Sequence, residues 1–382
     1  MLNTTQTRTT FKWGKGAALA LALTFGMALA GCGNNAGSNA AANAAAASNG
    51  GNNASSNTAA ASASASTDTD SSSNTTAAST DKKLTVYSAG PEGLATKLIE
   101  GYEAKTGVKV EMFQGTTGKI LARMEAEKSN PVADVVILAS LPSAQGLKDE
   151  GLTLPYPEAV NADKLNPDWS DADGNYFSTS ASALGIAYNT KLVKTPPTSW
   201  EDLTKPEFKD QVNIPDPSLS GSALDFMTGY LSVKGDSGWS LFENFKKNGV
   251  AMAGANQEAL DPVITGAKGV VAAAVDYMTY SSKAKGEPVD IVYPKDGTVI
   301  SPRPAAILKS TQHEANAKAF IDYLLSDEAQ KMVTDAYLLP GRTDIKADNR
   351  ANLDEIPQFK VDWDYMNKNG ADITEKFTQM FK

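Results

Sequence analysis

From residue 84 onward, short apolar runs typical of β-strands alternate with segments whose apolar residues recur at helical spacing. The runs at 84–88 and 108–113 are each followed by such a segment. The run at 134–138 is almost continuously apolar, which suits a sheet covered on both faces. A second series of strands and helices begins at 211–214 and includes the run at 269–275. This alternation predicts an α/β fold with mainly parallel sheets flanked by helices.

Crossovers join the two series, which predicts two lobes with a cleft between them. Lobe 1 is expected to comprise 82–186 plus 297–382, and lobe 2 to comprise 187–296. After the helices predicted within 314–339, an acidic and polar tail is expected to close the chain. Trp363, in that tail, is interpreted as a packing residue and not as a sugar platform.

The N-terminal segment carries a different pattern. Three basic residues precede an apolar stretch at 17–30, which is about 14 residues long and too short to span a bilayer. The stretch ends in Leu-Ala-Gly-Cys, and its cysteine, Cys32, is the only one in the chain. We expect 1–31 to be a lipoprotein signal peptide and Cys32 to be lipidated, which would anchor the protein at the outer face of the cytoplasmic membrane. The alternative is an ordinary signal peptide that happens to contain a cysteine.

Residues 32–81 are expected to form a disordered tether. From residue 33 to 80 the segment consists of Ala, Ser, Asn, Thr and Gly with two aspartates, and it has no aromatic or large aliphatic residue. Without such side chains it cannot offset the entropy of ordering.

The composition of the chain limits the kinds of partner and active site that it can have. A net charge of −9 without basic clusters argues against nucleic acid as a partner. One cysteine excludes a disulfide within the chain, and one histidine, His313, leaves little for a Ser-His-Asp triad or a His-rich zinc site. These counts do not forbid a hydrolase that uses paired carboxylates, but no acid pair stands in a recognisable motif. We expect a binding protein and not an enzyme, with no cofactor.

Four predicted strand ends share small hydroxyl residues or glycines at a helix start. Free backbone N–H groups and the helix dipole favour anions there, and ligands of open α/β sheets bind beyond the carboxyl ends of the strands. Each turn alone is also explained by ordinary helix capping. The predicted binding residues at these turns are Ser88, Ala89, Gly90, Thr116, Thr117, Gly118, Ser140, Ser220, Gly221 and Ser222.

Five further residues are candidates for the same cleft. Asn256 lies in a loop, and Asp276 ends an apolar run with Tyr277 and Tyr280 close behind. The tyrosines could equally be half-buried packing residues. Arg303 stands between two prolines, where it could clamp an anion through two hydrogen bonds or be a surface charge.

The chain resembles substrate-binding lipoproteins of bacterial ABC importers in three features. These are the lipidation motif Leu-Ala-Gly-Cys at 29–32 (a lipobox), the polar tether, and the sequence Leu-Thr-Val-Tyr-Ser-Ala at 84–89. The segments at 183–192 and 317–330 strengthen the resemblance, which covers about 84–345. It points to the type II periplasmic-binding fold, in the branch of ferric-ion, phosphonate and sugar-phosphate binders. The resemblance implies a two-strand hinge, closure over a small-molecule ligand, and delivery by a monomer to an ABC permease.

The ligand itself stays open at this level. The hydroxyl-rich helix starts favour a small anion such as a phosphonate or an organophosphate. A ferric species is the alternative, because Glu92, Asp276, Tyr277 and Tyr280 could supply hard oxygen ligands. The family's ferric binders place a His or an acid after the first strand and a tyrosine pair at the later strand end. In this chain the segment 88–92 has no histidine, and only one position of the tyrosine pair is matched at 276–280. Other classes to be weighed are a lipid-tethered sensor and a secreted hydrolase.

Overall fold

Ten strands form one mixed sheet in the computed structural model, which describes residues 82–382. The order is β2-β1-β3-β9-β4-β7-β5-β6, with β8 and β10 also paired to β4. The predicted signal peptide, Cys32 and the tether lie outside the described residues. The α/β class expected from the sequence is confirmed.

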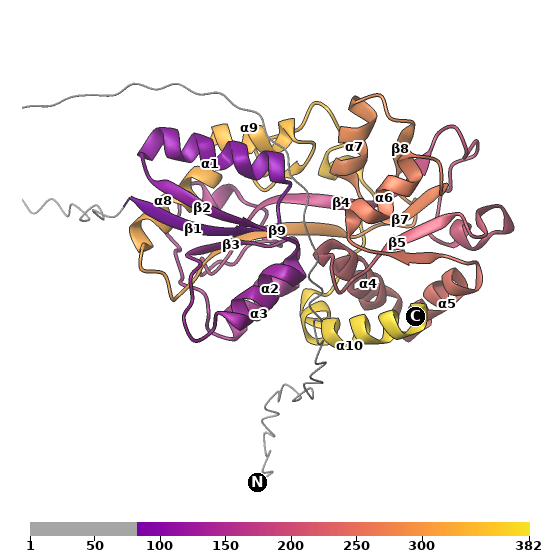
Figure 1. Cartoon of the computed structure of the whole chain (residues 1–382), viewed down its shortest axis with the longest axis horizontal. Coiled ribbons are helices and arrows are strands. Elements are labelled where there is room, and N and C mark those ends of the chain that lie inside the picture. Colours follow the sequence, from indigo (N-terminus) through magenta and orange to yellow (C-terminus); the bar gives the residue numbers. More distant parts are fainter. Residues whose placement is uncertain (1–81) are drawn as a thin grey trace, which may run out of the picture. The chain divides into compact units, whose positions relative to one another are not determined.

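Lobe 1 is built around three parallel strands, β1 (Lys83–Ser88), β2 (Lys109–Gln114) and β3 (Val135–Ile137). Two groups of helices cover its two faces (Figure 1). One group is α1 (Glu92–Thr106), α8 (Glu314–Leu324) and α9 (Asp327–Asp335), and the other is α2 (Thr117–Ala126) and α3 (Leu141–Asp149). β1 and β3 are buried on both faces, so their side chains are mostly apolar.

Lobe 2 repeats the arrangement around β5, β6 and β7, with β8 beside β4. The strands are β5 (Val212–Pro215), β6 (Ala251–Ala253), β7 (Val270–Val275) and β8 (Val289–Val292). The helices are α4 (Gly221–Lys234), α5 (Trp239–Lys247), α6 (Asn256–Ile264) and α7 (Asp276–Ala284). Short 3-10 turns are η1 (Ala162–Lys164), η2 (Glu201–Thr204), η3 (Pro206–Phe208), η4 (Gly235–Gly238) and η5 (Leu353–Glu355).

Two long strands connect the lobes: β4 (Phe177–Asn189) and β9 (Ile300–Ile307). They run antiparallel, and Figure 1 shows them in the middle of the molecule, between the helices of lobe 1 and the helices of lobe 2. β4 pairs with β9 as far as Ala183 and with β7 from Leu184 onward. The sequence predicted only the second half of β4, because the first half is rich in Ser and Thr. Those side chains are buried and bonded internally, as where Thr179 donates to the carbonyl of Arg303.

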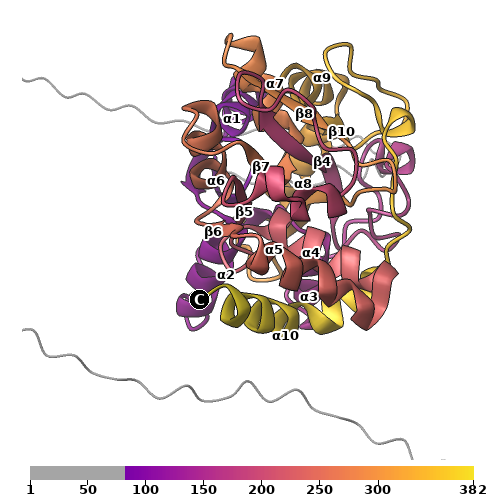
Figure 2. The same cartoon turned by 90° about the vertical axis from the view of Figure 1, so that its right-hand side faces the viewer.

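The C-terminal segment corrects the prediction of a polar tail. After β10 (Leu339–Pro340) the chain ends in a 19-residue amphipathic helix, α10 (Trp363–Phe381). Ile373 and Phe377 are buried in the core of lobe 2, whereas Trp363 packs on the core of lobe 1. The helix lies against both α3 and α4 (Figure 2). The average polarity of the segment concealed an apolar stripe of helical period.

Among residues 82–382, no helix has both the length and the apolar character needed to cross a membrane.

Candidate functional site

The strand ends of lobe 1 form the first side of the candidate site. At the end of β1, the buried Ser88 hydroxyl accepts a hydrogen bond from the N–H of Gly90 at 3.1 Å. At the start of α2, Thr116 caps the helix and the buried Thr117 accepts from the N–H of Ala139 at 3.0 Å. The ends of β1, β2 and β3 therefore lie together, as parallel strands require.

The start of α4 in lobe 2 contacts this edge directly. A Cβ atom on Gly221 would lie 2.7 Å from the carbonyl oxygen of Ala139 and 2.8 Å from the Thr117 hydroxyl. One on Gly118 would lie 2.6 Å from the carbonyl oxygen of Ser218. Only glycine allows such an approach of backbone to backbone. The two lobes are thus in contact at the predicted helix starts.

A buried carboxylate, which the sequence analysis missed, ties these elements together. Asp225 on α4 accepts from the hydroxyls of Ser140 and Ser301, each at 2.7 Å. Burial raises the pKa of Asp225 to about 7, although both hydroxyls and the N–H of Leu141 oppose the shift. Its signal in the sequence was a lone acid inside the apolar helix 221–234.

Ser220, Ser222 and Asn256 form a separate hydrogen-bonded group in lobe 2. The Ser220 hydroxyl donates to Oδ1 of Asn256 at 3.0 Å, and Nδ2 of Asn256 donates to the Ser222 hydroxyl at 3.0 Å. Ser220 also caps α4 by accepting from the N–H of Ala223. These side chains bond mainly to one another and hold the start of α4 against that of α6.

Arg303 on β9 links the end of β1 to Tyr277 of lobe 2. Its side chain donates to the Ser182 hydroxyl at 3.3 Å and to the carbonyl of Ala89 at 3.1 Å. Cζ lies 5.2 Å from the centroid of the Tyr277 ring. Burial raises the pKa of Tyr277, against the opposing effect of Arg303, so its hydroxyl is neutral at neutral pH. Arg303 is 3% exposed, which rules out the interpretation as a surface charge.

Asp276 and Tyr280 belong to a neighbouring cluster. Asp276 pairs with Arg350 at 2.5 Å, and both side chains are fully buried. The Tyr293 hydroxyl donates to Asp276 at 3.0 Å and lies 3.3 Å from the Tyr280 hydroxyl. Arg350 and Tyr293 were missed because neither stands in a periodic or recurring sequence pattern.

A cavity of about 400 Å³ adjoins the contact between the lobes. Thr117 and Gly118 reach it from lobe 1, and Ser218 and Gly221 from lobe 2. Its other walls are Leu121 of α2, Ser143 of α3, Pro217, Leu224 of α4, and Gly370, Ala371, Thr374 and Glu375 of α10. The C-terminal helix, which the sequence analysis treated as a tail, therefore borders the candidate site.

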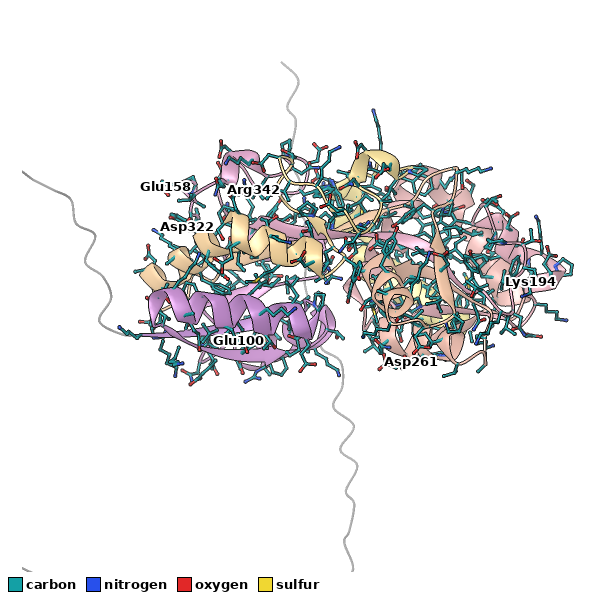
Figure 3. The ribbon with its side chains drawn as sticks, turned by 90° about the horizontal axis from the view of Figure 1, so that it is seen from above. Glu100, Glu158, Lys194, Asp261, Asp322 and Arg342 are labelled. Carbon is teal, nitrogen blue, oxygen red and sulfur yellow. The ribbon has the colours of Figure 1, made fainter. Side chains whose placement is uncertain are left out.

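The acidic surplus of the chain is spread over its outer surfaces. Glu100 and Glu158 lie at the periphery of lobe 1, and Asp261 lies at that of lobe 2 (Figure 3). Glu92 is exposed on the first turn of α1. Within the described part of the chain, no three His, Cys, Asp or Glu side chains are grouped so as to hold a metal ion.

Similarity to known proteins agrees with this geometry. A family model described as bacterial extracellular solute-binding protein matches residues 130–369. A putative 2-aminoethylphosphonate-binding periplasmic protein of Salmonella typhimurium is 24% identical over 288 residues, which cover 70% of this chain and 81% of the relative. An Fe(3+)-binding periplasmic protein of Serratia marcescens is 25% identical over 275 residues, covering 67% and 77%.

Among solved structures, the periplasmic binding protein AfuA from Actinobacillus pleuropneumoniae, with fructose 6-phosphate bound, superposes with a TM-score of 0.72. It is 23% identical, and the match covers 78% of this chain and 98% of AfuA. That likeness confirms the type II periplasmic-binding fold.

Proposed function

We propose that this chain, which belongs to the bacterial extracellular solute-binding proteins, captures a small organic anion for an ABC importer. The ligand class we favour is a phosphonate or an organophosphate. The relatives named for 2-aminoethylphosphonate and found with fructose 6-phosphate support this class, since both compounds carry an anionic phosphorus group.

The single observation that carries the proposal is the state of Arg303. Its guanidinium is buried, yet no carboxylate of the described residues lies within the 4.0 Å of an ion pair, and the partly ionised Asp225 acts on it only from a greater distance. An unpaired buried charge is costly, and an anionic ligand would remove that cost. Phosphonate and phosphate oxygens match the planar fork of arginine, which can donate two parallel hydrogen bonds.

The cavity of about 400 Å³ at the contact between the lobes is within the usual size range for small-molecule sites. Its walls include Leu121, Leu224 and the carboxylate-bearing Glu375, but neither Arg303 nor Tyr277. The anion proposed here would therefore bind at Arg303 and not in this cavity.

The contact at Gly118 and Gly221 supports closure of the lobes about β4 and β9. Both glycines sit where backbone of one lobe meets backbone of the other. We propose that the predicted residues at the strand ends and helix starts, together with Asn256, Tyr277 and Arg303, contribute hydrogen bonds or shape to the closed site, whereas Asp276 and Tyr280 act from the neighbouring cluster. The closed form would then be recognised by the permease.

A ferric species is the second candidate, favoured by the Serratia relative. Of its four proposed ligands, however, Glu92 is exposed and Asp276 is paired with Arg350. The structure would have to rearrange to bring Glu92, Asp276, Tyr277 and Tyr280 onto one ion.

The anchoring of the protein is also a proposal. The family is extracellular, which agrees with a signal peptide at 1–31. Lipidation of Cys32 and a tether at 32–81 would hold a monomer at the outer face of the cytoplasmic membrane.

A thermal-shift screen tests the function. The purified chain is heated with 2-aminoethylphosphonate, methylphosphonate, fructose 6-phosphate and ferric citrate. A ligand at a hundred times its Kd stabilises the native state by about 2.7 kcal/mol, which raises the Tm measurably. We expect at least one phosphorus compound to raise the Tm. A shift in Tm with ferric citrate alone, together with a tyrosinate-to-iron absorption band, would show that the ligand is iron and not a phosphorus compound. Turnover of any of these compounds would indicate an enzyme.

A further inference from the structure

We propose that Arg350 determines the sign of the ligand's charge, because it neutralises Asp276 beside the candidate site. The inference rests on the proposed function and names the residue that makes this site select anions. It assigns a role to the C-terminal segment after β10, for which the sequence analysis predicted no function.

The first step is that the Asp276 carboxylate accepts hydrogen bonds from four donors of the protein itself. Oδ2 accepts from the N–H of Ala183 at 3.0 Å, the Tyr293 hydroxyl at 3.0 Å and Nη2 of Arg350 at 2.5 Å. Oδ1 accepts from the N–H of Tyr277 at 2.8 Å. Three of these donors converge on Oδ2, which has only two lone pairs, and one donor is on Oδ1. Because the Asp276 side chain is also fully buried and paired with Arg350, its charge is neutralised inside the fold.

The second step is that Arg350 is itself firmly held. Its Nη1 donates to the carbonyl of Tyr337 at 2.9 Å and its Nε to the carbonyl of Ala351 at 2.8 Å. Its guanidinium lies 5.4 Å from the centroid of the Tyr280 ring, which stacks on Tyr337. A guanidinium fixed by this many groups is a built feature of the fold, and a buried charge pair leaves no net charge at Asp276.

The third step is the position of the pair. Asp276 begins α7, and the next residue, Tyr277, faces Arg303. An unpaired carboxylate there would repel a bound anion and attract Arg303 away from it. With Arg350 in place, the charge of Asp276 does not cancel that of Arg303. Asp225, the other buried acid nearby, also acts on Arg303, but burial raises its pKa to about 7, so it carries only part of a negative charge at neutral pH.

The test compares three proteins by calorimetric titration with methylphosphonate. Arg350→Gln leaves the Asp276 charge unpaired, whereas the double variant Asp276→Asn with Arg350→Gln removes both charges and keeps polar groups at both positions. We expect the single variant to bind on the order of tenfold more weakly than the wild type, and the double variant to return to within about threefold of it. Unchanged binding by the single variant overturns the inference, as does a double variant that binds as weakly as the single one.

Two further measurements keep the outcome decisive. If Arg350→Gln does not fold, judged by circular dichroism, Arg350→Lys replaces it. This variant keeps the charge, so we expect it to bind methylphosphonate nearly as well as the wild type does. A loss of affinity as large as tenfold contradicts a role through charge.

The wild type is also titrated with ferric citrate. Binding of methylphosphonate together with no effect of the Arg350 variants overturns this inference alone. Binding of ferric citrate and of no phosphorus compound by the wild type overturns the proposed function as well.

Discussion

The guanidinium of Arg303 lies over the ring of Tyr277, with 5.2 Å between Cζ and the ring centroid. Arg303 comes from β9, which connects the lobes, and Tyr277 from the first turn of α7 in lobe 2. The contact therefore joins a connecting strand to lobe 2. A desolvated cation–π contact contributes about 2 kcal/mol and uses the face of the guanidinium, while Nε and Nη1 on its edge donate to Ser182 and Ala89.

Replacing Arg303 is expected to abolish most of the ligand affinity. Arg303→Gln removes the charge but keeps a donor of similar reach, so the loss reports on charge-assisted hydrogen bonds worth about 1.5–3 kcal/mol each. We expect the Kd for methylphosphonate to rise by about 10- to 100-fold in calorimetric titration. Lys331→Gln, at an exposed position on α9, serves as the control and leaves the Kd unchanged. An equal effect of the two variants would contradict an anion clamp at Arg303.

Adding a methyl group at Gly221 is expected to hold the lobes apart. Its Cβ would lie 2.7 Å from the carbonyl oxygen of Ala139, which is backbone and cannot move aside. Such overpacking costs about 1–3 kcal/mol, so ligand affinity falls by about tenfold or more and small-angle scattering shows a larger radius of gyration. Gly93→Ala is the matched control, because a Cβ there meets nothing within 4 Å. A Gly221→Ala protein that binds as the wild type does would show that the contact is not part of closure.

Asp225 is expected to make the stability of the protein depend on pH. Its pKa is raised from 3.8 to about 7, so the folded state binds the proton more tightly than the unfolded state. Stability from this group is complete below pH 3.8 and is lost as the pH rises through about 7. Thermal melts of Asp225→Asn and the wild type should therefore diverge in favour of the variant from about pH 4 to about pH 8. A difference in Tm that stays constant over this range would mean that Asp225 is not the titrating group.

The C-terminal helix is expected to be essential for stability. Phe377 is fully buried, and its ring packs edge to face on Phe242 at 5.4 Å. Phe377→Ala should lower the free energy of unfolding by about 3–5 kcal/mol in a urea titration. Phe381→Ala removes a partly exposed ring of the same helix and should cost less than half as much. Equal and small losses would indicate that α10 is a dispensable tail.

The prediction for the N-terminal segment concerns where the protein is found in the cell, and not the folding of the lobes. Cys32→Ser removes the thiol that lipidation requires, so the variant should move from the detergent-extractable membrane fraction to the soluble extracytoplasmic fraction. Immunoblotting of fractionated cells measures the change, and a variant such as Ser38→Ala in the same segment should stay with the membrane. A Cys32→Ser protein that remains detergent-extractable would rule out a lipid anchor at this residue.

The sequence predicted the order of strands and helices well, because each depends on local periodicity. The helix starts at Thr116, Ser140 and Ser220 were found in the same way, since each capping hydroxyl lies in the short turn after its strand. Two elements were not predicted from the sequence because their composition is polar. The first half of β4 is rich in Ser and Thr, and α10 is polar on average, so neither shows the apolar content expected of a buried element.

What the sequence determined by itself is the class of fold, the two series of strands and the chemistry at the strand ends, all of which follow from neighbours along the chain. Only the tertiary structure decided which charges are cancelled. Asp276 meets Arg350 across 74 residues, and Ser140 meets Asp225 across 85. Such pairs leave no local pattern, because the energy of a buried charge depends on the groups that fold around it. The tertiary structure therefore assigns Asp276 to a neutral pair with Arg350 and gives Arg303 no such ion pair among residues 82–382.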